Sequence, residues 1–434
     1  MRRPSVWARL VGAQGAVVEG VDVDKHPGGG GVVLVVSVRV SRRGRSRCGV
    51  CQRRCPGYDR GAGRRRWRAL DLGTVPAVIE AEAPRVTCPR HGVVVAAVPW
   101  ARHQAGHTRD FDDTVAWMAV VTSKSAVCEL LRIAWRTVGS IITRVEADFT
   151  AGTDRLAGLR RIGIDEVSYK KGHKYLTVVV DHDTGRLVWA APGRDKKTVR
   201  AFFDALGAQR AGQLTHVSAD AAEWIGMVVA ARAPQAVRCA DPFHVVAWAT
   251  EALDEVRRSA WNTARRVAGA TRRAGGGRHL AKGTEVSRKL KGARYALWKN
   301  PENLTRRQHA KLAWVAKTDP RLHRAYLLKE GLRLVFQLPI EEAAEALEAW
   351  IGWARRSRIP AFIDLQRRIV KHKASILAAI EHGLSNGRIE SVNTKIRLIT
   401  RVAFGFRSPD ALIALIALAM LNLGGHRPAL PGRT

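Results

Sequence analysis

Three acidic residues, Asp165, Asp220 and Glu390, stand out in a chain that is otherwise strongly basic. The two aspartates each follow a short apolar segment, and the glutamate lies in an amphipathic helical pattern. The chain contains 73 Lys and Arg against 38 Asp and Glu, which gives a formal net charge of +35. Such a charge attracts polyanions, because neutralised phosphates release condensed counterions. Carboxylates held together in such a protein suit divalent metal ions beside a nucleic-acid backbone, so the pattern indicates cutting or joining of nucleic acid.

A second set of chemically active residues lies near the N-terminus. Cys48 and Cys51 form a Cys-x-x-Cys pair, and Cys88 begins a Cys-x-x-His sequence that ends at His91. This donor set suits tetrahedral Zn²⁺ better than disulfides. We therefore predict one structural zinc ion on these four residues. Cys55 is an alternative for one of the ligands, and reduced thiols with a chance Cys-x-x-Cys pair are the other interpretation.

The elements that must position the carboxylates form an α/β pattern. The strands we expect lie at residues 162–165, 174–181, 186–191, 214–218 and 236–240, with helices at 196–206 and 224–231. Three strands joined by turns, followed by alternating helix and strand, is the order of an RNase H-like sheet. Asp165 and Asp220 end two of these strands, and Asp241 follows the fifth.

A helical pattern that begins near residue 386 carries Glu390. Its apolar residues recur at helical spacing and predict a face that packs on the sheet. Glu390, Asn393, Arg397 and Arg401 fall on an adjacent face, so one carboxylate emerges from a basic helix beside the strand ends. We take Arg397 and Arg401 as candidate DNA contacts. The alternative for Glu390 is a pairing with Thr394 or Arg397 on its own helix.

Residues 110–148 predict a helix-turn-helix. The helices we expect span 111–122, 123–131 and 135–147, with a break at 132–134. In that arrangement Trp135, Arg136, Ser140 and Arg144 would be exposed on the third helix and could contact DNA. A plain three-helix packing unit is the alternative.

Residues 245–380 have an almost continuous helical pattern, which we interpret as one large insertion in the α/β unit. Trp350 and Trp353 lie three residues apart on an amphipathic helix and are predicted to be core residues. Trp298 stands among basic residues just before Asn300-Pro301. We consider two roles for it, stacking on an unpaired base near the cut site and packing within the insertion.

The chain is long and apolar enough for two or three domains with hydrophobic cores, with 434 residues of which 46% are hydrophobic. No signal peptide is evident, and the best candidate membrane span, residues 411–423, is too short to cross a bilayer. We expect that segment to be a buried core helix. The protein is expected to be cytoplasmic and DNA-associated, with no membrane partner.

Several motifs in order resemble those of one family, the bacterial insertion-sequence transposases of the ISL3 family. The motifs are Ile162-Gly163-Ile164-Asp165-Glu166, Val217-Ser218-Ala219-Asp220, the Asp241-Pro242-Phe243-His244 element, two segments at 300–305 and 350–357, and Ser385 to Asn393. The resemblance covers roughly residues 45 to 420. Two departures affect substrate positioning and not the metal-binding groups. Pro242 replaces a basic residue, and Ala221-Ala222 replaces a Met-Ser type pair.

The resemblance implies a DDE transposase that binds terminal inverted repeats and catalyses strand cleavage and strand transfer. It implies that Asp165, Asp220 and Glu390 hold two Mg²⁺ ions, with Mn²⁺ as a substitute, and that Asp241 and His244 support the site. The partners would be double-stranded DNA, as transposon ends and target, and further copies of the chain in a dimer or larger. The rivals are a transposase-derived DNA-binding regulator without catalysis and a general RNase H-like nuclease.

On this basis the chain divides into five segments. They are an N-terminal domain with a zinc-finger module (1–105), a helix-turn-helix-like region (106–155), the first part of an RNase H-like catalytic core (156–262), a helical insertion (263–380) and the last helices of the core (381–425).

Overall fold

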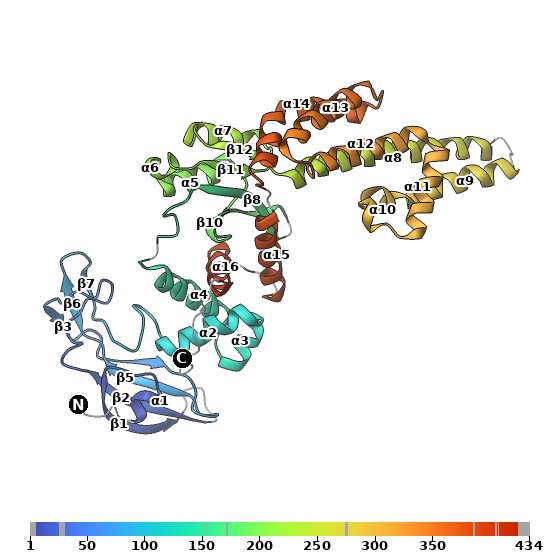
Figure 1. Cartoon of the computed structure of the whole chain (residues 1–434). Helices are drawn as coiled ribbons and strands as arrows, with labels where there is room; N and C mark the ends of the chain where they lie inside the picture. The colour runs from blue at the N-terminus through green and yellow to red at the C-terminus, as the bar shows by residue number, and fades with distance from the viewer. Residues whose placement is uncertain are drawn as a thin grey trace. The chain divides into compact units, whose positions relative to one another are not determined.

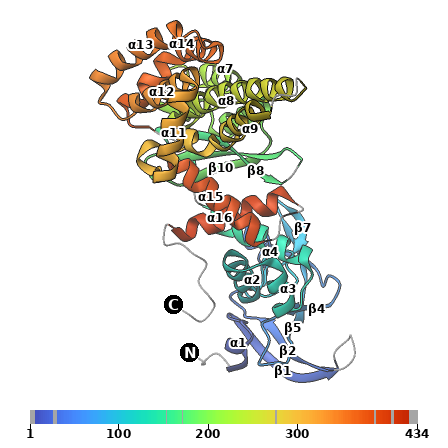
Figure 2. The ribbon, with the colours of Figure 1, turned by 90° about the vertical axis from the view of Figure 1, so that its right-hand side faces the viewer.

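The computed structural model describes residues 6–25, 31–152, 154–170, 172–273, 277–384, 387–403, 406 and 408–423. The chain divides into two compact units (Figures 1 and 2). The first unit combines Met1–Asp154 with Ile396–Thr434, and the second is Arg155–Lys395. None of the helices in the described residues has the length and apolarity that crossing a bilayer requires.

The first unit begins with two small sheets. A four-stranded sheet has the order β1-β2-β5-β4, and a three-stranded sheet has the order β3-β6-β7. Alternating residues Ala77, Ile79 and Ala81 of β5 are buried in the core of the first sheet, together with Trp67 and Trp100. The elements are α1 (Val6–Leu10), β1 (Ala16–Lys25), β2 (Val32–Val40), β3 (Gly57–Asp59), β4 (Arg64–Arg68), β5 (Ala77–Glu82), β6 (Arg85–Cys88) and β7 (Gly92–Val95).

The predicted helix-turn-helix is formed by α2 (Arg109–Val121), α3 (Lys124–Leu131) and α4 (Trp135–Thr150). Thr108 and Ser123 cap the first two helices by accepting hydrogen bonds from the backbone amides of Phe111 and Ala126. The last helix, α16 (Pro409–Leu423), packs on α4 and α2, and among its described side chains Leu412 and residues 415–418 are buried. The segment predicted to be a core helix therefore completes the core of the helix-turn-helix.

The second unit is built on a five-stranded sheet of order β10-β9-β8-β11-β12. The three strands β8 (Arg161–Lys170), β9 (Lys174–Asp181) and β10 (Leu187–Pro192) are antiparallel. The strands β11 (His216–Ala219) and β12 (Val237–Ala240) continue the sheet parallel to β8. This mixed sheet is the RNase H-like arrangement that the order of elements predicted.

Two helices cover one face of the sheet, α5 (Lys196–Leu206) and α7 (Glu223–Arg232), with the short α6 (Ala208–Ala211) between them. Val199, Phe202 and Phe203 of α5 are buried against Ile162 and Ile164 of β8. The opposite face receives α14 (Pro360–Glu381) and the first turns of α15 (Gly387–Val402). A sheet covered on both faces leaves its strand ends as the place where polar side chains can gather.

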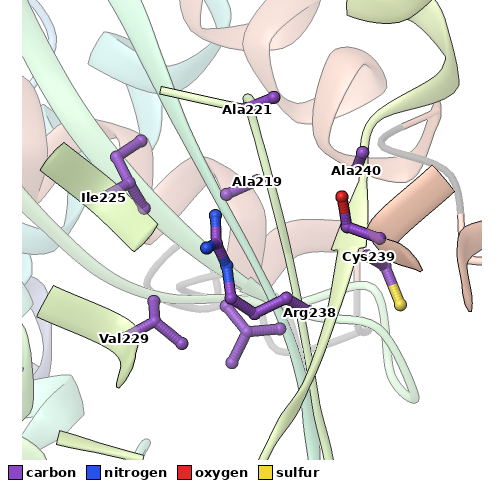
Figure 3. A pocket seen from close by; sticks show the side chains of 9 residues that line it. Ala219, Ala221, Ile225, Val229, Arg238, Cys239 and Ala240 are labelled. Atoms are coloured by element: carbon purple, nitrogen blue, oxygen red, sulfur yellow. The ribbon is translucent and has the colours of Figure 1, made fainter. Parts of the chain in front are cut away.

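The contact between β12 and α7 depends on a glycine below the strand ends. A β-carbon at Gly226 would lie 2.4 Å from Nη1 of Arg238, so any larger residue would require the guanidinium to move. Figure 3 shows the Arg238 side chain reaching from β12 towards Ile225 and Val229 of α7. The cavity beside it is about 10 Å³, room for about one water molecule. Partial burial lowers the pKa of Arg238 from its usual value.

A helical insertion separates β12 from α15. In Figure 1 its helices α8, α9 and α12 form a long arm, in which α8 lies beside both α9 and α12. Its core contains buried residues from most of these helices, among them Leu253, Leu297, Leu328 and Phe362. The elements are α8 (Pro242–Arg273), α9 (Gly277–Gly292), α10 (Arg294–Trp298), η1 (Pro301–Asn303), α11 (Arg306–Thr318), α12 (Pro320–Val335), α13 (Ile340–Arg356) and α14.

The two tryptophans of α13 differ from each other. Trp350 is buried, and its indole N–H donates a hydrogen bond to the backbone carbonyl of Leu328 (2.8 Å). Trp353 is 38% exposed, so the prediction that it is a core residue was wrong. Both rings rest against Gly331 of α12, at 3.3 Å from the position of an added β-carbon. Trp353 therefore lies at the solvent-exposed edge of the contact between α13 and α12.

Candidate active site and DNA-binding elements

Three aspartates directly follow three residues that are aligned with one another across the parallel strands. Ile164 of β8 is aligned with Ala219 of β11, and Ala219 with Ala240 of β12. Asp165, Asp220 and Asp241 are the next residue in each strand. Because parallel strands present their carboxyl ends at one edge of a sheet, the three carboxylates emerge together.

The strand that carries Asp165 is longer than predicted. We expected it to end at residue 165, whereas β8 continues to Lys170. Beyond Ile164 the described residues give it no parallel partner, but it remains paired with β9, where Asp165 is opposite Val178. Asp165 is therefore held in a hairpin at the point where the parallel part of the sheet ends, which gives it a firmer backbone than a strand end would.

His244 links the other two aspartates. Its Nδ1 lies 3.4 Å from Oδ1 of Asp220, and its Nε2 lies 3.6 Å from Oδ2 of Asp241. Asp241 is buried and accepts a hydrogen bond from the backbone amide of Phe243 (3.2 Å), at the start of α8. The imidazole thus lies between two carboxylates, on a helix whose first turn is fixed by one of them.

Helix α15 packs on β8 at a glycine. Ile389 is fully buried, and a β-carbon at Gly163 would lie 2.0 Å from its Cδ1. One turn further, the amide nitrogen of Asn393 donates a hydrogen bond to Oδ2 of Asp165 (2.7 Å). Sequence reasoning placed Asn393 on the face of Glu390 but gave it no role. Its spacing of three residues from Glu390 was the sequence feature that could have indicated a role in the same site.

Glu390 lies in the first turn of α15, three residues before Asn393 and so on the same side of the helix. Its side chain is exposed, and it forms no ion pair with any other described side chain. The structure brings Asp165, Asp220, Asp241 and His244 to one edge of the sheet. Glu390 lies on the neighbouring helix α15. Ser385 and Asn386, which begin the same motif, lie outside the described residues.

Burial shifts the pKa of two acids of the site upwards. Burial raises the pKa of Asp165, although the backbone amide of Glu166 donates it a hydrogen bond (2.7 Å) and opposes the shift. Burial raises the pKa of Glu166 to about 7, against the attraction of Arg194. A cation in the site would reverse this balance, because a positive charge favours both carboxylates in the ionised form.

Buried oxygens that form no hydrogen bond make the site suitable for cations. In the described parts of the chain, the buried side-chain atoms that lack a hydrogen-bond partner are five nitrogens and three oxygens. All three oxygens belong to this site, namely Oε1 of Glu166, Oδ1 of Asp220 and Oδ1 of Asn393. Oxygen ligands of this type are those that Mg²⁺ and Mn²⁺ prefer. The residues present therefore fit a divalent cation, although no three acidic or histidine ligand atoms described here lie within 4.8 Å of one another.

A substitution at Gly163 tests whether the docking of α15 sets up the site. We expect Gly163→Val to push Ile389 away and to destabilise the second unit by about 1–3 kcal/mol, since the contact is already closed. DNA cleavage should fall by about 10²-fold, because Asn393 and Glu390 shift with the helix. Thermal unfolding and a cleavage assay measure both effects.

The matched control is Gly212→Val, at an exposed helix end where an added β-carbon meets nothing closer than 3.5 Å. If Gly163→Val cleaved DNA at the wild-type rate, the position of α15 would not matter for the reaction.

The predicted zinc ligands form a compact cluster. Ligand atoms of Cys48, Cys51, Cys88 and His91 all lie within 4.8 Å of one another, as in no other group of such residues in the described chain. Nδ1 of His91 is 3.5 Å from Sγ of Cys48 and of Cys88. Three thiols and an imidazole are a donor set typical of structural zinc. A hydrogen bond from the backbone amide of Arg90 contributes most to lowering the pKa of Cys88 to about 6.

Two neighbours define how this cluster is built. Gly49 lies within the Cys-x-x-Cys turn. A residue with a side chain does not fit there, because its β-carbon would lie 2.5 Å from the backbone carbonyl oxygen of Val95. Cys55 is buried next to the cluster, with Sγ 3.4 Å from the carbonyl oxygen of Arg53. It is not one of the four clustered ligands, so the structure favours the four residues first named.

The third helix of the helix-turn-helix differs from the prediction at two positions. Arg136 and Ser140 are exposed on α4 as expected. Arg144, however, donates two hydrogen bonds to Asp112 of α2 (2.9 and 3.0 Å), whose side chain is fully buried. Trp135 is half-buried, with the amine of Lys124 4.2 Å from its ring centroid. The expectation that Arg144 is free to contact DNA was therefore wrong, and Trp135 is only partly exposed. Arg144 joins α4 to α2, and Trp135 contacts Lys124 of α3.

Replacing the two arginines of α4 separates folding from DNA binding. We expect Arg144→Ala to destabilise the helix-turn-helix by about 3 kcal/mol, because it removes the main partner of a buried carboxylate. Arg136→Ala should change the free energy of unfolding by less than about 0.5 kcal/mol and weaken DNA binding. Chemical denaturation and a gel-shift titration distinguish the two. The reverse pattern would mean that Arg144 is a DNA contact.

The remaining candidate DNA contacts lie on two helices. Arg397 and Arg401 are exposed on α15. Trp298 is half-buried, with the guanidinium of Arg294 3.9 Å from its ring centroid and Tyr295 at its edge. An arginine already covers the ring, which supports the packing alternative for Trp298.

Comparison with known families covers nearly all of this architecture. Residues 162–416 match a family model described as an ISL3 transposase with a DDE domain. Residues 96–146 match the helix-turn-helix domain of transposase family ISL3, and residues 44–91 match the zinc finger of transposase IS204/IS1001/IS1096/IS1165.

Named relatives align over nearly the whole chain. The chain is 62% identical to the transposase for insertion sequence element IS1557 of Mycobacterium tuberculosis, over 100% of this chain and 98% of the relative. It is 27% identical to the transposase for insertion sequence element IS1001 of Bordetella parapertussis, over 94% of this chain and 96% of the relative.

Proposed function

Because the chain belongs to the ISL3 family of insertion-sequence transposases, we propose that the edge of its five-stranded sheet is a divalent-cation site that cuts and joins the DNA ends of its own element. The chain is a transposase with a DDE domain, a helix-turn-helix and a zinc ribbon. The observation that carries the proposal is the alignment of Asp165, Asp220 and Asp241 after one line of register, beside buried oxygens that lack hydrogen-bond donors.

Asp165, Asp220 and Glu390 would hold the cations, which we take to be two Mg²⁺ ions with Mn²⁺ as a substitute. When bound, they would supply Lewis acidity that activates water or a 3′-hydroxyl and stabilises the leaving 3′-oxygen of the scissile phosphodiester. Asn393 fixes one oxygen of Asp165 by a hydrogen bond and so orients the carboxylate. His244 holds Asp220 against Asp241 and limits the rotation of both side chains.

The other parts of the chain would bring DNA to this edge. Arg136 and Ser140 of α4, and Arg397 and Arg401 of α15, are exposed where they can meet phosphates. The net charge of +35 supplies affinity that does not depend on sequence. We propose that the helix-turn-helix and the zinc ribbon recognise the terminal inverted repeats. Because two ends must be joined, the active form would be a homo-oligomer, bound to DNA in the cytoplasm.

The test is an assay with a DNA fragment that carries both ends of the element. The purified protein should bind the ends in EDTA and should cut them at the element boundary only after Mg²⁺ or Mn²⁺ is added. Binding without cutting under any divalent cation would favour the regulator alternative. Cutting of DNA that lacks the ends at the same rate would favour a general nuclease.

A further inference from the structure

A fourth carboxylate lies beside the three acidic residues of the proposed site. Glu166 follows Asp165 on β8, and the side chains of neighbouring strand residues point to opposite faces. Asp165 meets Asn393 of α15 on one face. Glu166 extends towards the other, where Arg194 stands in the connection between β10 and α5. The carboxylates therefore approach the sheet edge from both of its faces.

The two oxygens of Glu166 have different surroundings. Oε2 lies 3.4 Å from Nε of Arg194, a long and partly exposed ion pair. Oε1 is buried and has no hydrogen-bond partner. The side chain as a whole is only 6% exposed. A buried carboxylate oxygen without a donor is costly, and proteins rarely leave one unless a ligand completes it.

The nearest groups identify the ligand as a cation. Asp165 precedes Glu166 on β8, and Asp220 follows Ala219, the register partner of Ile164 two residues before Glu166. Asp220 presents a buried Oδ1 that forms no hydrogen bond, with Nδ1 of His244 3.4 Å away. Negatively charged carboxylates gathered at one sheet edge repel each other, and a divalent cation held by them removes that repulsion.

We propose that Glu166 is a fourth carboxylate ligand of the divalent-cation site, and that it binds through Oε1. The inference rests on the proposed function, because it concerns the same cations. It adds a ligand to Asp165, Asp220 and Glu390. Two octahedral cations need more oxygen ligands than three carboxylates supply, so a fourth carboxylate fits a site for two ions.

A different role for Glu166 makes the opposite prediction. Arg194 packs on the ring of Tyr175, with its guanidinium carbon 5.1 Å from the ring centroid. In the alternative role, Glu166 serves only to anchor that arginine. In that case, loss of Arg194 and loss of Glu166 would have the same effect. If Glu166 binds a cation, Arg194 competes for its carboxylate, and removal of the arginine cannot weaken the site.

The experiment measures Mn²⁺ binding to the zinc-loaded full-length protein without DNA, by electron paramagnetic resonance of free Mn²⁺. We expect Glu166→Gln to weaken binding by about 10- to 100-fold. Arg194→Gln should bind Mn²⁺ at least as tightly as the wild type. Asp165→Asn is the reference for a lost ligand, and Glu223→Gln, an exposed glutamate bound to Lys371 in the same unit, is the matched control.

Two outcomes would overturn the inference while leaving the proposed function intact. One is wild-type affinity in Glu166→Gln with weakened binding in Asp165→Asn, and the other is equal weakening in Glu166→Gln and Arg194→Gln. If Asp165→Asn binds as the wild type does, the proposed cation site itself fails, and the inference with it. Thermal unfolding in EDTA checks that Glu166→Gln is folded, since glutamine has the same shape and no charge to bury.

Discussion

Asp220→Asn is expected to abolish DNA cleavage while leaving DNA binding nearly unchanged. The substitution keeps the size of the side chain but removes a charge from the oxygen that lacks a hydrogen-bond donor. Cations at a phosphodiester contribute several kcal/mol to the transition state, so the cleavage rate should fall by about 10³-fold or more. Affinity for end DNA should stay within about twofold, because it comes from many dispersed Lys and Arg residues. Single-turnover cleavage and a gel-shift titration give the two numbers.

Asp165→Asn and Glu390→Gln should behave in the same way. The matched control is Asp204→Asn in the same unit. It removes the charge of an exposed aspartate on α5, whose carboxylate lies 2.7 Å from the guanidinium of Arg232 on α7. It should cleave DNA like the wild type. An equal loss of DNA binding in all the acidic-site variants would show instead that these carboxylates maintain the fold.

Removal of zinc is expected to unfold the ribbon and leave the second unit folded. Structural zinc contributes about 10 kcal/mol or more to the folding of small modules, and here four ligands join the turn at Cys48 to the hairpin at Cys88. Chelation should therefore remove specific end binding, while the thermal transition of residues 155–395 is retained. Calorimetry with and without a chelator, together with binding to end and unrelated DNA, measures this.

Two cysteine variants refine this result. Cys88→Ser should lose the zinc, whereas Cys55→Ser should keep it, since Cys55 is buried nearby but is not one of the four clustered ligands. Elemental analysis reports the zinc content of both. Protein purified without chelators that contains no zinc would contradict the assignment.

Much of the second unit could be predicted because its signals are local. The β-branched run at 174–181 is the strand β9, and the apolar spacing at 196–206 is the helix α5. The zinc ligands were also predictable, because the ligand spacing itself is the signal. The order of strands and helices was enough to predict the RNase H-like sheet, since few topologies satisfy three antiparallel strands followed by two parallel ones.

Other features depend on contacts between distant residues. Arg144 resembles an exposed basic residue of a recognition helix, but its partner Asp112 lies 32 residues earlier and is buried. Asn393 reaches Asp165 across 228 residues. The sequence does not predict a role for Glu166, because no local pattern shows that one of its oxygens is buried without a hydrogen-bond donor. Such roles become visible only when the folded chain brings the partners together.

The measurement that tests the central claim most directly uses end DNA with sulfur in place of the leaving 3′-oxygen at the cleavage site. Sulfur binds Mg²⁺ poorly and Mn²⁺ better. If cations held by Asp165, Asp220 and Glu390 stabilise that atom, cleavage of the sulfur-containing DNA should be strongly slowed in Mg²⁺ and largely restored in Mn²⁺. Equal rates for oxygen- and sulfur-containing DNA in Mg²⁺, with cutting still dependent on these residues, would contradict a cation at the leaving group.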